Sequence, residues 1–110
     1  MEATPQVVEI YQDENGVRPF EEWMKDLRDG RARSKINARL ARVRLGNFGD
    51  SKGVGEGVRE LRVDYGPGYR VYLARHGKAV VVLLCGGDKS SQSEDIRTAK
   101  ALWRDYKERS

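Results

Sequence analysis

The sequence predicts an α+β fold: a small, largely antiparallel sheet with two N-terminal helices on one face and a C-terminal helix, in the order β-α-α-β-β-β-α. Apolar residues recur with helical spacing in two stretches before residue 46 and in one stretch after residue 91. Between them, residues 58–85 alternate between apolar and polar or form a short apolar run, as strands do. The length of 110 residues suits one core, so residues 1–110 are expected to form a single domain.

The N-terminal part contains a strand and two helices. Residues 6–11 alternate and are rich in β-branched side chains, which predicts the strand. Pro19 suits the first turn of a helix, because its missing N–H costs nothing there. A second helix follows Asp29-Gly30 and spans residues 31–45. The apolar faces of these helices contain Phe20, Trp23, Met24 and Leu27 in the first and Ala32, Ile36, Leu40 and Val43 in the second.

A basic stripe runs along the second helix beside its apolar face. Its members are Arg31, Lys35, Arg39 and Arg42. No Asp or Glu occurs between Gly30 and Gly49, although the whole chain has a net charge of only +4. Such a stripe is either a solvated face or a surface for an acidic partner or a nucleic acid.

Residues 46–57 are predicted to form a flexible loop, since this stretch contains five glycines. The run Gly53-Val54-Gly55-Glu56-Gly57 superficially resembles a phosphate loop. It lacks the Gly-Lys-Ser/Thr ending and precedes a strand rather than a helix, so we exclude that interpretation.

Residues 58–65 and 69–75 predict a β-hairpin joined by Gly66-Pro67-Gly68. Pairing Tyr65 with Tyr69 keeps the apolar residues of both strands on one face. On that face the pairs are Val63–Val71 and Leu61–Leu73, and on the other they are Asp64–Arg70, Arg62–Tyr72 and Glu60–Ala74.

A central strand and a helix complete the fold. Residues 79–85 are apolar on both faces, and a two-residue turn before them places Val80 and Val82 on the core face. Ser91 and Glu94 have the spacing of a capping box, which predicts a helix packed at the edge of the sheet. Its core-facing residues are Ile96, Ala99, Trp103 and Tyr106.

The polar face of the hairpin is the strongest candidate site. Its members are Glu60, Arg62, Asp64, Arg70, Tyr72 and Lys89, with Lys52 on the adjoining loop. Burying an unpaired ion costs several kcal/mol, so we expect this face to be open to water or to a ligand. Guanidinium groups beside a tyrosine suit a phosphodiester, whereas the alternative is a solvated polar face held by a cross-strand Asp64–Arg70 ion pair.

Composition excludes several other functions. One Cys and one His allow neither an intrachain disulfide nor a Cys/His zinc site, and we expect no metal and no cofactor. Cys85 is expected to be a core thiol and His76 a turn residue. The longest apolar run, residues 79–85, is too short to cross a bilayer, and the N-terminus shows no secretory signal, which favours a cytoplasmic protein.

The stretch GVRELRVDYGPGYRVYLARHGKAVVVLLCGGDKSSQSEDIRTAKALW resembles the C-terminal half of bacterial addiction-module killer proteins, the HigB-like branch of the RelE/ParE toxin superfamily. The run RPFEEWMKDL resembles the first helix of the same family. The resemblance implies a toxin of a type II toxin–antitoxin module that cleaves mRNA on the ribosome without a metal. It also implies a helix-turn-helix antitoxin encoded by the adjacent gene, and contact with operator DNA only as the toxin–antitoxin complex.

The resemblance assigns roles to individual positions. Arg62, Arg70 and Lys89 match the basic catalytic residues: Arg62 would position the scissile phosphate, and the other two would stabilise the pentacoordinate transition state. Lys52, Arg59, Tyr72 and Gln92 are expected to bind RNA or phosphate. The basic stripe, Arg31, Lys35, Arg39 and Arg42, is expected to contact the antitoxin or the ribosome.

Two positions depart from the RelE pattern. Ile96 stands where that branch has a catalytic Tyr, and Glu60 stands where it has a basic residue. Glu60 would be either a general base for the ribose 2′-OH or an ion-pair partner of Arg62. The departures leave two alternatives open: a ParE-like inhibitor of DNA gyrase, and a catalytically inactive co-repressor.

Overall fold

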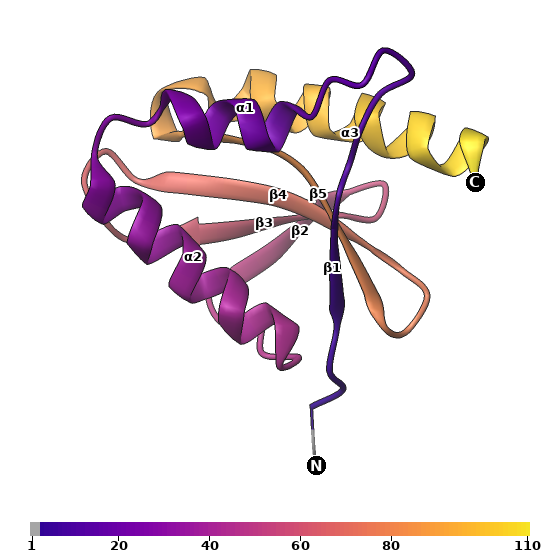
Figure 1. The fold of residues 1–110 in the computed structure, drawn as a ribbon, viewed down its shortest axis with the longest axis horizontal. Helices are drawn as coiled ribbons and strands as arrows, with labels where there is room; N and C mark the ends of the chain where they lie inside the picture. Colours follow the sequence, from indigo (N-terminus) through magenta and orange to yellow (C-terminus); the bar gives the residue numbers. More distant parts are fainter. Residues whose placement is uncertain (1–2) are drawn as a thin grey trace.

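The computed structural model describes residues 3–110 as a five-stranded sheet with helices on both faces (Figure 1). The strand order is β1-β5-β4-β3-β2; β1 runs parallel to β5 and every other neighbouring pair is antiparallel. This confirms the α+β class. The elements are β1 (Val7–Ile10), α1 (Pro19–Asp26), α2 (Gly30–Arg44), β2 (Ser51–Gly55), β3 (Val58–Val63), β4 (Tyr69–His76), β5 (Val80–Asp88), a 3₁₀ turn η1 (Lys89–Ser91) and α3 (Gln92–Arg109).

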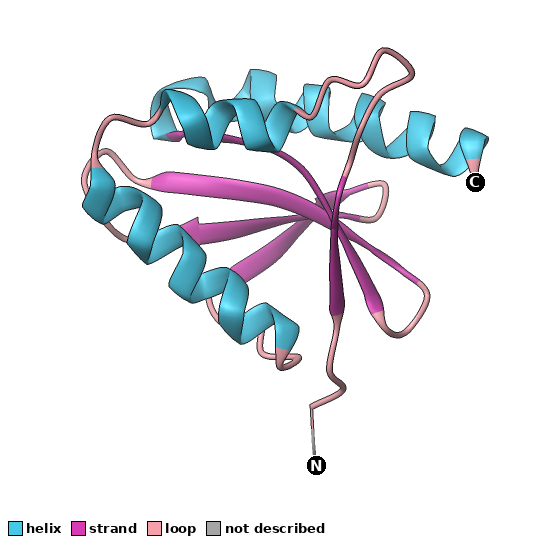
Figure 2. Ribbon diagram, viewed as in Figure 1, coloured by secondary structure: helices cyan, strands magenta, loops and turns pink. Residues whose placement is uncertain are grey.

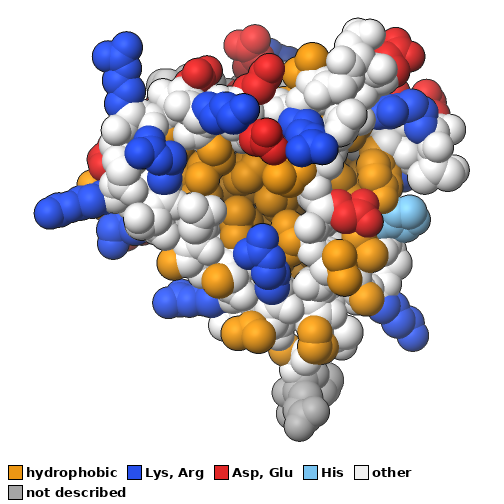
Figure 3. Space-filling view, in the orientation of Figure 1, with side chains coloured by type: hydrophobic (Ala, Val, Ile, Leu, Met, Phe, Trp, Pro, Cys, Tyr) orange, Lys and Arg blue, Asp and Glu red, His pale blue; other side chains and the backbone are white. Residues whose placement is uncertain are grey.

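Helices α1 and α2 cover one face of the sheet (Figure 2). Pro19 occupies the first turn of α1, and the Asp29 carboxylate caps α2 by accepting from the backbone N–H groups of Arg31 and Ala32. Hydrophobic side chains remain visible between α1, α2 and β1, with Lys and Arg side chains around them (Figure 3). The buried core of this face consists of Phe20, Ile36, Leu40, Val43, Leu61, Val63, Val71, Leu73, Val81 and Leu83.

The prediction that the C-terminal helix packs at the edge of the sheet is wrong, because α3 lies across the opposite face. Strand β5 is apolar on both sides, so its second face also needs a cover. The capping box is not formed either: the Ser91 hydroxyl donates to Asp95 instead of capping the helix. The core under α3 consists of Tyr11, Val58, Tyr72, Ala74, Val82, Leu84, Cys85, Ala99 and Trp103.

Residues 51–55 form an edge strand, β2, where the sequence predicts a flexible loop. The backbone reverses at Glu56 and Gly57, which have φ angles of 54° and 87°. Two positive φ angles in succession make the tight type I′ geometry that suits a two-residue hairpin. The observed order is therefore β-α-α-β-β-β-β-α, and Lys52 lies directly opposite Glu60.

The β3–β4 hairpin differs from the predicted register by two residues. Val63 pairs with Tyr69, and Arg62 pairs with Arg70, so the loop spans residues 64–68. Tyr65 belongs to this loop: its N–H donates to Val63, and its C=O accepts from Gly68. Because the shift is even, every side chain keeps its predicted face although its partner across the strands changes.

The prediction that Val80 and Val82 join the core under α1 and α2 is also wrong. His76 pairs with Val80, so the turn before β5 contains three residues instead of two and the faces are exchanged. A bulge at Leu84 follows, because Leu73 pairs with Leu83 while Tyr72 pairs with Cys85.

We expect Gly86→Ala to destabilise the fold by about 1–3 kcal/mol, since added volume in a packed core forces its neighbours apart. A Cβ atom at Gly86 would overlap the Trp23 ring of α1. Urea unfolding measures the effect. Gly53→Ala is the matched control in β2, where no atom lies within 4 Å of an added Cβ. Equal unfolding midpoints for the two variants would contradict this packing.

Candidate functional site

The centre of the candidate site is the carboxylate of Glu60, which is 0% exposed. Its Oε1 lies 3.2 Å from Arg62 Nε and 3.5 Å from Arg70 Nε. Its Oε2 accepts from the Tyr72 hydroxyl at 3.2 Å and from Gln92 Nε2 at 2.8 Å. Four residues that the sequence nominates, from β3, β4 and α3, therefore meet at the buried Glu60 carboxylate.

The sheet register places these groups. Lys52, Glu60 and Tyr72 lie side by side on β2, β3 and β4, and Arg62 and Arg70 form the next row on β3 and β4. Residues paired across neighbouring strands point to the same face. Gln92, the first residue of α3, reaches the group from above the sheet. The cluster therefore rests on strands and a helix rather than on loops.

Glu60 is a charged carboxylate in the folded protein. Burial on its own would raise the pKa of Glu60. Hydrogen bonds from Gln92, Arg62 and Tyr72 and the positive charge of Arg70 outweigh that effect and hold the pKa below its usual range. Burial and the adjacent Glu60 charge raise the pKa of Tyr72, so its hydroxyl stays protonated and donates. The low pKa, the burial and the occupied oxygens of Glu60 argue against a general base.

An open pocket of about 250 Å³ lies beside the buried carboxylate. We name it the Arg70 pocket; it is lined by Asp50, Arg62, Val63, Asp64, Gly68, Arg70 and Lys89. The Arg70 side chain is 12% exposed and that of Arg62 39%, while Lys89 is exposed at the start of η1. Three of the four predicted catalytic residues therefore line one pocket, and Glu60 lies behind it.

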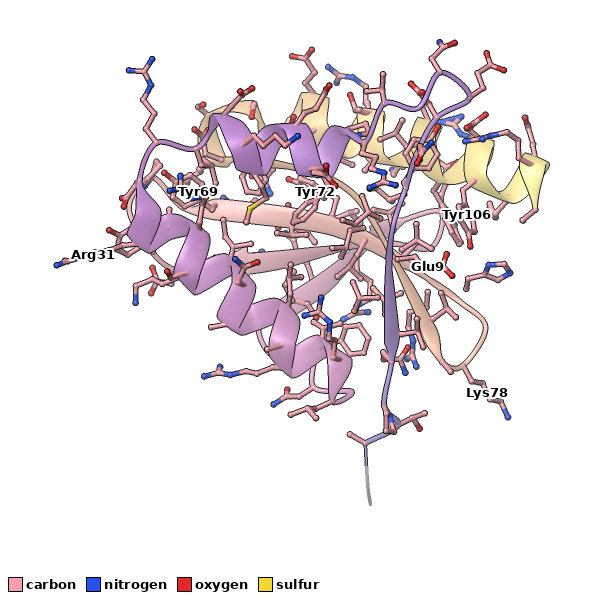
Figure 4. The ribbon with its side chains drawn as sticks, in the orientation of Figure 1. Glu9, Arg31, Tyr69, Tyr72, Lys78 and Tyr106 are labelled. Carbon is pink, nitrogen blue, oxygen red and sulfur yellow. The ribbon has the colours of Figure 1, made fainter. Side chains whose placement is uncertain are left out.

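None of the four predicted phosphate-binding residues lines the Arg70 pocket. Tyr72 is 0% exposed, so the prediction that it contacts RNA directly is wrong, and Figure 4 shows it within the sheet. Arg59 pairs with Leu73 on the face under α1 and α2, and its guanidinium donates to Ser51. Its separation from the cluster follows from the alternation of side chains along β3. Lys52 is exposed at the edge of the cluster, and Gln92 binds Glu60.

The polar face is open only in part: Glu60 and Tyr72 are buried where α3 packs on the sheet, whereas Arg62, Asp64, Arg70 and Lys89 line the open Arg70 pocket. The predicted Asp64–Arg70 ion pair is also wrong. With the register shifted by two residues, Asp64 lies in the loop. Arg70 lies opposite Arg62 across the strands and forms its ion pair with Glu60. Sequence reasoning missed Asp50, which lines the Arg70 pocket, because it precedes a strand that the sequence did not predict. The Glu56-Gly57 pair was the available signal.

The basic stripe of α2 divides into two kinds of residue. Arg39 is a structural link: its guanidinium donates to the backbone carbonyls of Arg62, Phe48 and Asp50. Arg31, Lys35 and Arg42 are exposed, and Figure 4 shows Arg31 pointing away from the protein.

The remaining chemical groups lie in ordinary structural positions. Cys85 is buried, as predicted, and burial raises the pKa of its thiol to about 12. His76 ends β4, where its Nδ1 lies 2.9 Å from the Tyr106 hydroxyl. Within residues 3–110 we find no group of three or more His, Cys, Asp or Glu side chains placed to hold a metal ion. No helix in that range is long and apolar enough to span a membrane.

The fold and the site define an α+β protein with a pocket lined by three cations and two aspartates beside a buried carboxylate. The chain is 54% identical over 83 residues to an uncharacterized protein of Haemophilus influenzae strain Rd. The match covers 76% of this chain and 84% of the relative, so the chain belongs to the same family as the H. influenzae protein. No protein-family model matches the chain.

We expect Glu60→Gln to destabilise the protein by about 3 kcal/mol at pH 7, because removing one partner of a buried ion pair leaves its charge uncompensated. The folded-state pKa of Glu60 is depressed. Its contribution is therefore complete above the unfolded-state pKa of about 4.3 and is lost as the pH falls through the folded-state pKa. The gap in unfolding free energy between wild type and variant should shrink in acid.

Urea unfolding at a series of pH values measures this gap. Glu14→Gln, in an exposed turn, is the control that keeps the wild-type stability. A gap that stays constant down to strongly acidic pH would show that the Glu60 charge is not the stabilising group.

Proposed function

We propose that this chain is the toxin of a type II toxin–antitoxin module and acts as a metal-free mRNA endonuclease. The observation that supports this most directly is the Arg70 pocket, where Arg62, Arg70 and Lys89 converge while Glu60 accepts a hydrogen bond from Arg62 Nε and forms an ion pair with Arg70. Arginine binds phosphate through paired N–H donors, so guanidinium groups held in place beside an open pocket suit a phosphodiester.

The chemistry requires no group beyond the RNA, these side chains and water. The ribose 2′-hydroxyl gives its proton to water of the open pocket as its oxygen forms a bond to the adjacent phosphorus, and the bond from phosphorus to the 5′-oxygen breaks. Arg62 and Arg70 would stabilise the negative charge that develops on the phosphorane oxygens, because fixed cations act most strongly where charge appears in the transition state. The exposed ammonium group of Lys89 can donate a proton to the departing 5′-oxygen.

The resemblance to HigB-like toxins supports the same conclusion. We infer a RelE-like arrangement in which β2 is the additional edge strand. A helix-turn-helix antitoxin encoded beside this gene, mRNA on the ribosome as substrate, and operator DNA bound only by the toxin–antitoxin complex belong to this proposal, as does action in the cytoplasm. Glu60 then has the role of positioning Arg62 and Arg70 and not of accepting the 2′ proton.

We expect Arg62→Ala and Lys89→Ala to abolish growth arrest on induction and to lower the cleavage rate about 100- to 1,000-fold, the cost of removing a transition-state donor. Both side chains are partly or fully exposed, so the fold should survive. Mapping of RNA 5′ ends after brief induction measures cleavage within translated codons. Arg70→Ala should have the same effect, with circular dichroism to verify folding.

Lys78→Ala is the matched control, since Lys78 lies in the exposed turn before β5, far from the pocket (Figure 4). Full toxicity of folded Arg70→Ala would refute the proposal. Arrested cells with intact mRNA and inhibited supercoiling would indicate a gyrase inhibitor instead, and absence of toxicity on expression would indicate a co-repressor.

A further inference from the structure

A second pocket adjoins the Arg70 pocket. It has a volume of about 290 Å³ and lies between α2 and β3; we name it the α2 pocket. Val63 and Asp64 line both pockets, so the two hollows share a wall. The α2 pocket is lined by Lys35, Ala38, Arg39, Arg42, Val63 and Asp64.

Arg39 ties the two pockets into one surface. Its guanidinium donates to the backbone carbonyls of Arg62 and Asp50, two residues that line the Arg70 pocket. Arg39 is itself part of the α2 pocket. These hydrogen bonds hold α2 against β3. The distance between the two pockets is therefore fixed by the fold, and one extended ligand can occupy both.

The α2 pocket is positively charged at its exposed rim. Lys35 and Arg42 are exposed, and α2 contains no acidic residue. The Lys35 ammonium group also lies 5.4 Å from the centre of the Tyr65 ring, which fixes this cation near the hairpin loop. Cations outnumber carboxylates in the lining of both pockets, although Asp64 lines both and Asp50 lines the Arg70 pocket. Two neighbouring pockets with this excess of cations in their linings suit a ligand with regularly repeated negative charge, and a polynucleotide has one phosphate per nucleotide.

We propose that single-stranded RNA bound in the Arg70 pocket continues into the α2 pocket, where Lys35 and Arg42 bind phosphates that flank the cleaved bond. The inference takes its substrate class, RNA, from the proposed function. It adds the path that the RNA follows where it leaves the Arg70 pocket. The shared wall favours RNA over an acidic protein, because the same polymer then occupies both pockets.

Fluorescence anisotropy with 2′-O-methylated RNA, which cannot undergo 2′-OH attack, tests the inference. A labelled nine-nucleotide strand and a three-nucleotide strand are titrated with wild type, with the double variant Lys35→Glu/Arg42→Glu and with Lys78→Glu. We expect the double variant to bind the longer strand about fivefold to tenfold more weakly. The slope of the logarithm of its binding constant against the logarithm of salt concentration should become less steep by about 1.4. This is about 0.7 for each phosphate that the variant no longer neutralises.

Binding of the three-nucleotide strand should be the same for all three proteins, as should binding of the nine-nucleotide strand to wild type and Lys78→Glu. Circular dichroism verifies that each variant is folded. Equal affinity of wild type and the double variant for the longer strand overturns the inference, as does the absence of RNA binding by wild type. If only the affinity for the antitoxin falls, the inference is overturned and the α2 pocket belongs to a protein partner.

Growth arrest that is lost in Arg70→Ala, together with mapped cleavage, would leave the proposed function intact even if the α2 pocket failed this test. Absence of that arrest or of cleavage in the wild-type protein would instead count against the function. The two results come from separate measurements, one in cells and one with purified protein.

Discussion

The buried negative charge of Glu60 determines how this part of the molecule is built. A carboxylate with no exposure to water is tolerated only when charged or hydrogen-bonding groups surround it. Here Arg62 and Arg70 supply opposite charge, and Tyr72 and Gln92 donate hydrogen bonds. These interactions fix the relative positions of β3, β4 and the start of α3. A displacement of any of them would leave the Glu60 carboxylate without one of its partners.

The same carboxylate resolves a conflict between the two arginines. Arg62 and Arg70 lie directly opposite each other on β3 and β4, and like charges in that position repel. Glu60 is within 3.5 Å of the Nε atom of each, so it stabilises the pair in the absence of a ligand. One carboxylate does not neutralise two guanidinium groups. The lining of the Arg70 pocket contains three cations, Arg62, Arg70 and Lys89, and two further carboxylates, Asp50 and Asp64, so these cations are balanced only when all three acidic side chains are counted.

Alternation along β3 and β4 is sufficient to predict which residues share a face, because an even change of register moves no side chain through the sheet. The exact partners cannot be predicted in this way, since Tyr65 fits a strand or a loop equally well by pattern. The burial of Glu60 cannot be predicted from the sequence either, because a charged residue indicates an exposed face. The hydrogen bond from Gln92 that compensates for this burial depends on where α3 lies. The position of α3 in turn follows from the two apolar faces of β5, which the sequence alone assigns the wrong way round.

Arg39 shows how the charge of α2 becomes part of the site. By sequence it is one of six cations on a helix without acids and one of the four that form the basic stripe, and the pattern alone treats those four as equivalent. In the structure its guanidinium satisfies backbone carbonyls of the segment that leads into β2 and of β3. These three hydrogen bonds occupy both terminal nitrogens of the guanidinium, so Arg39 links the elements of the fold. Its contribution to binding is indirect: it keeps Lys35 and Arg42 beside Arg62, and thereby places the exposed cations of α2 next to the Arg70 pocket.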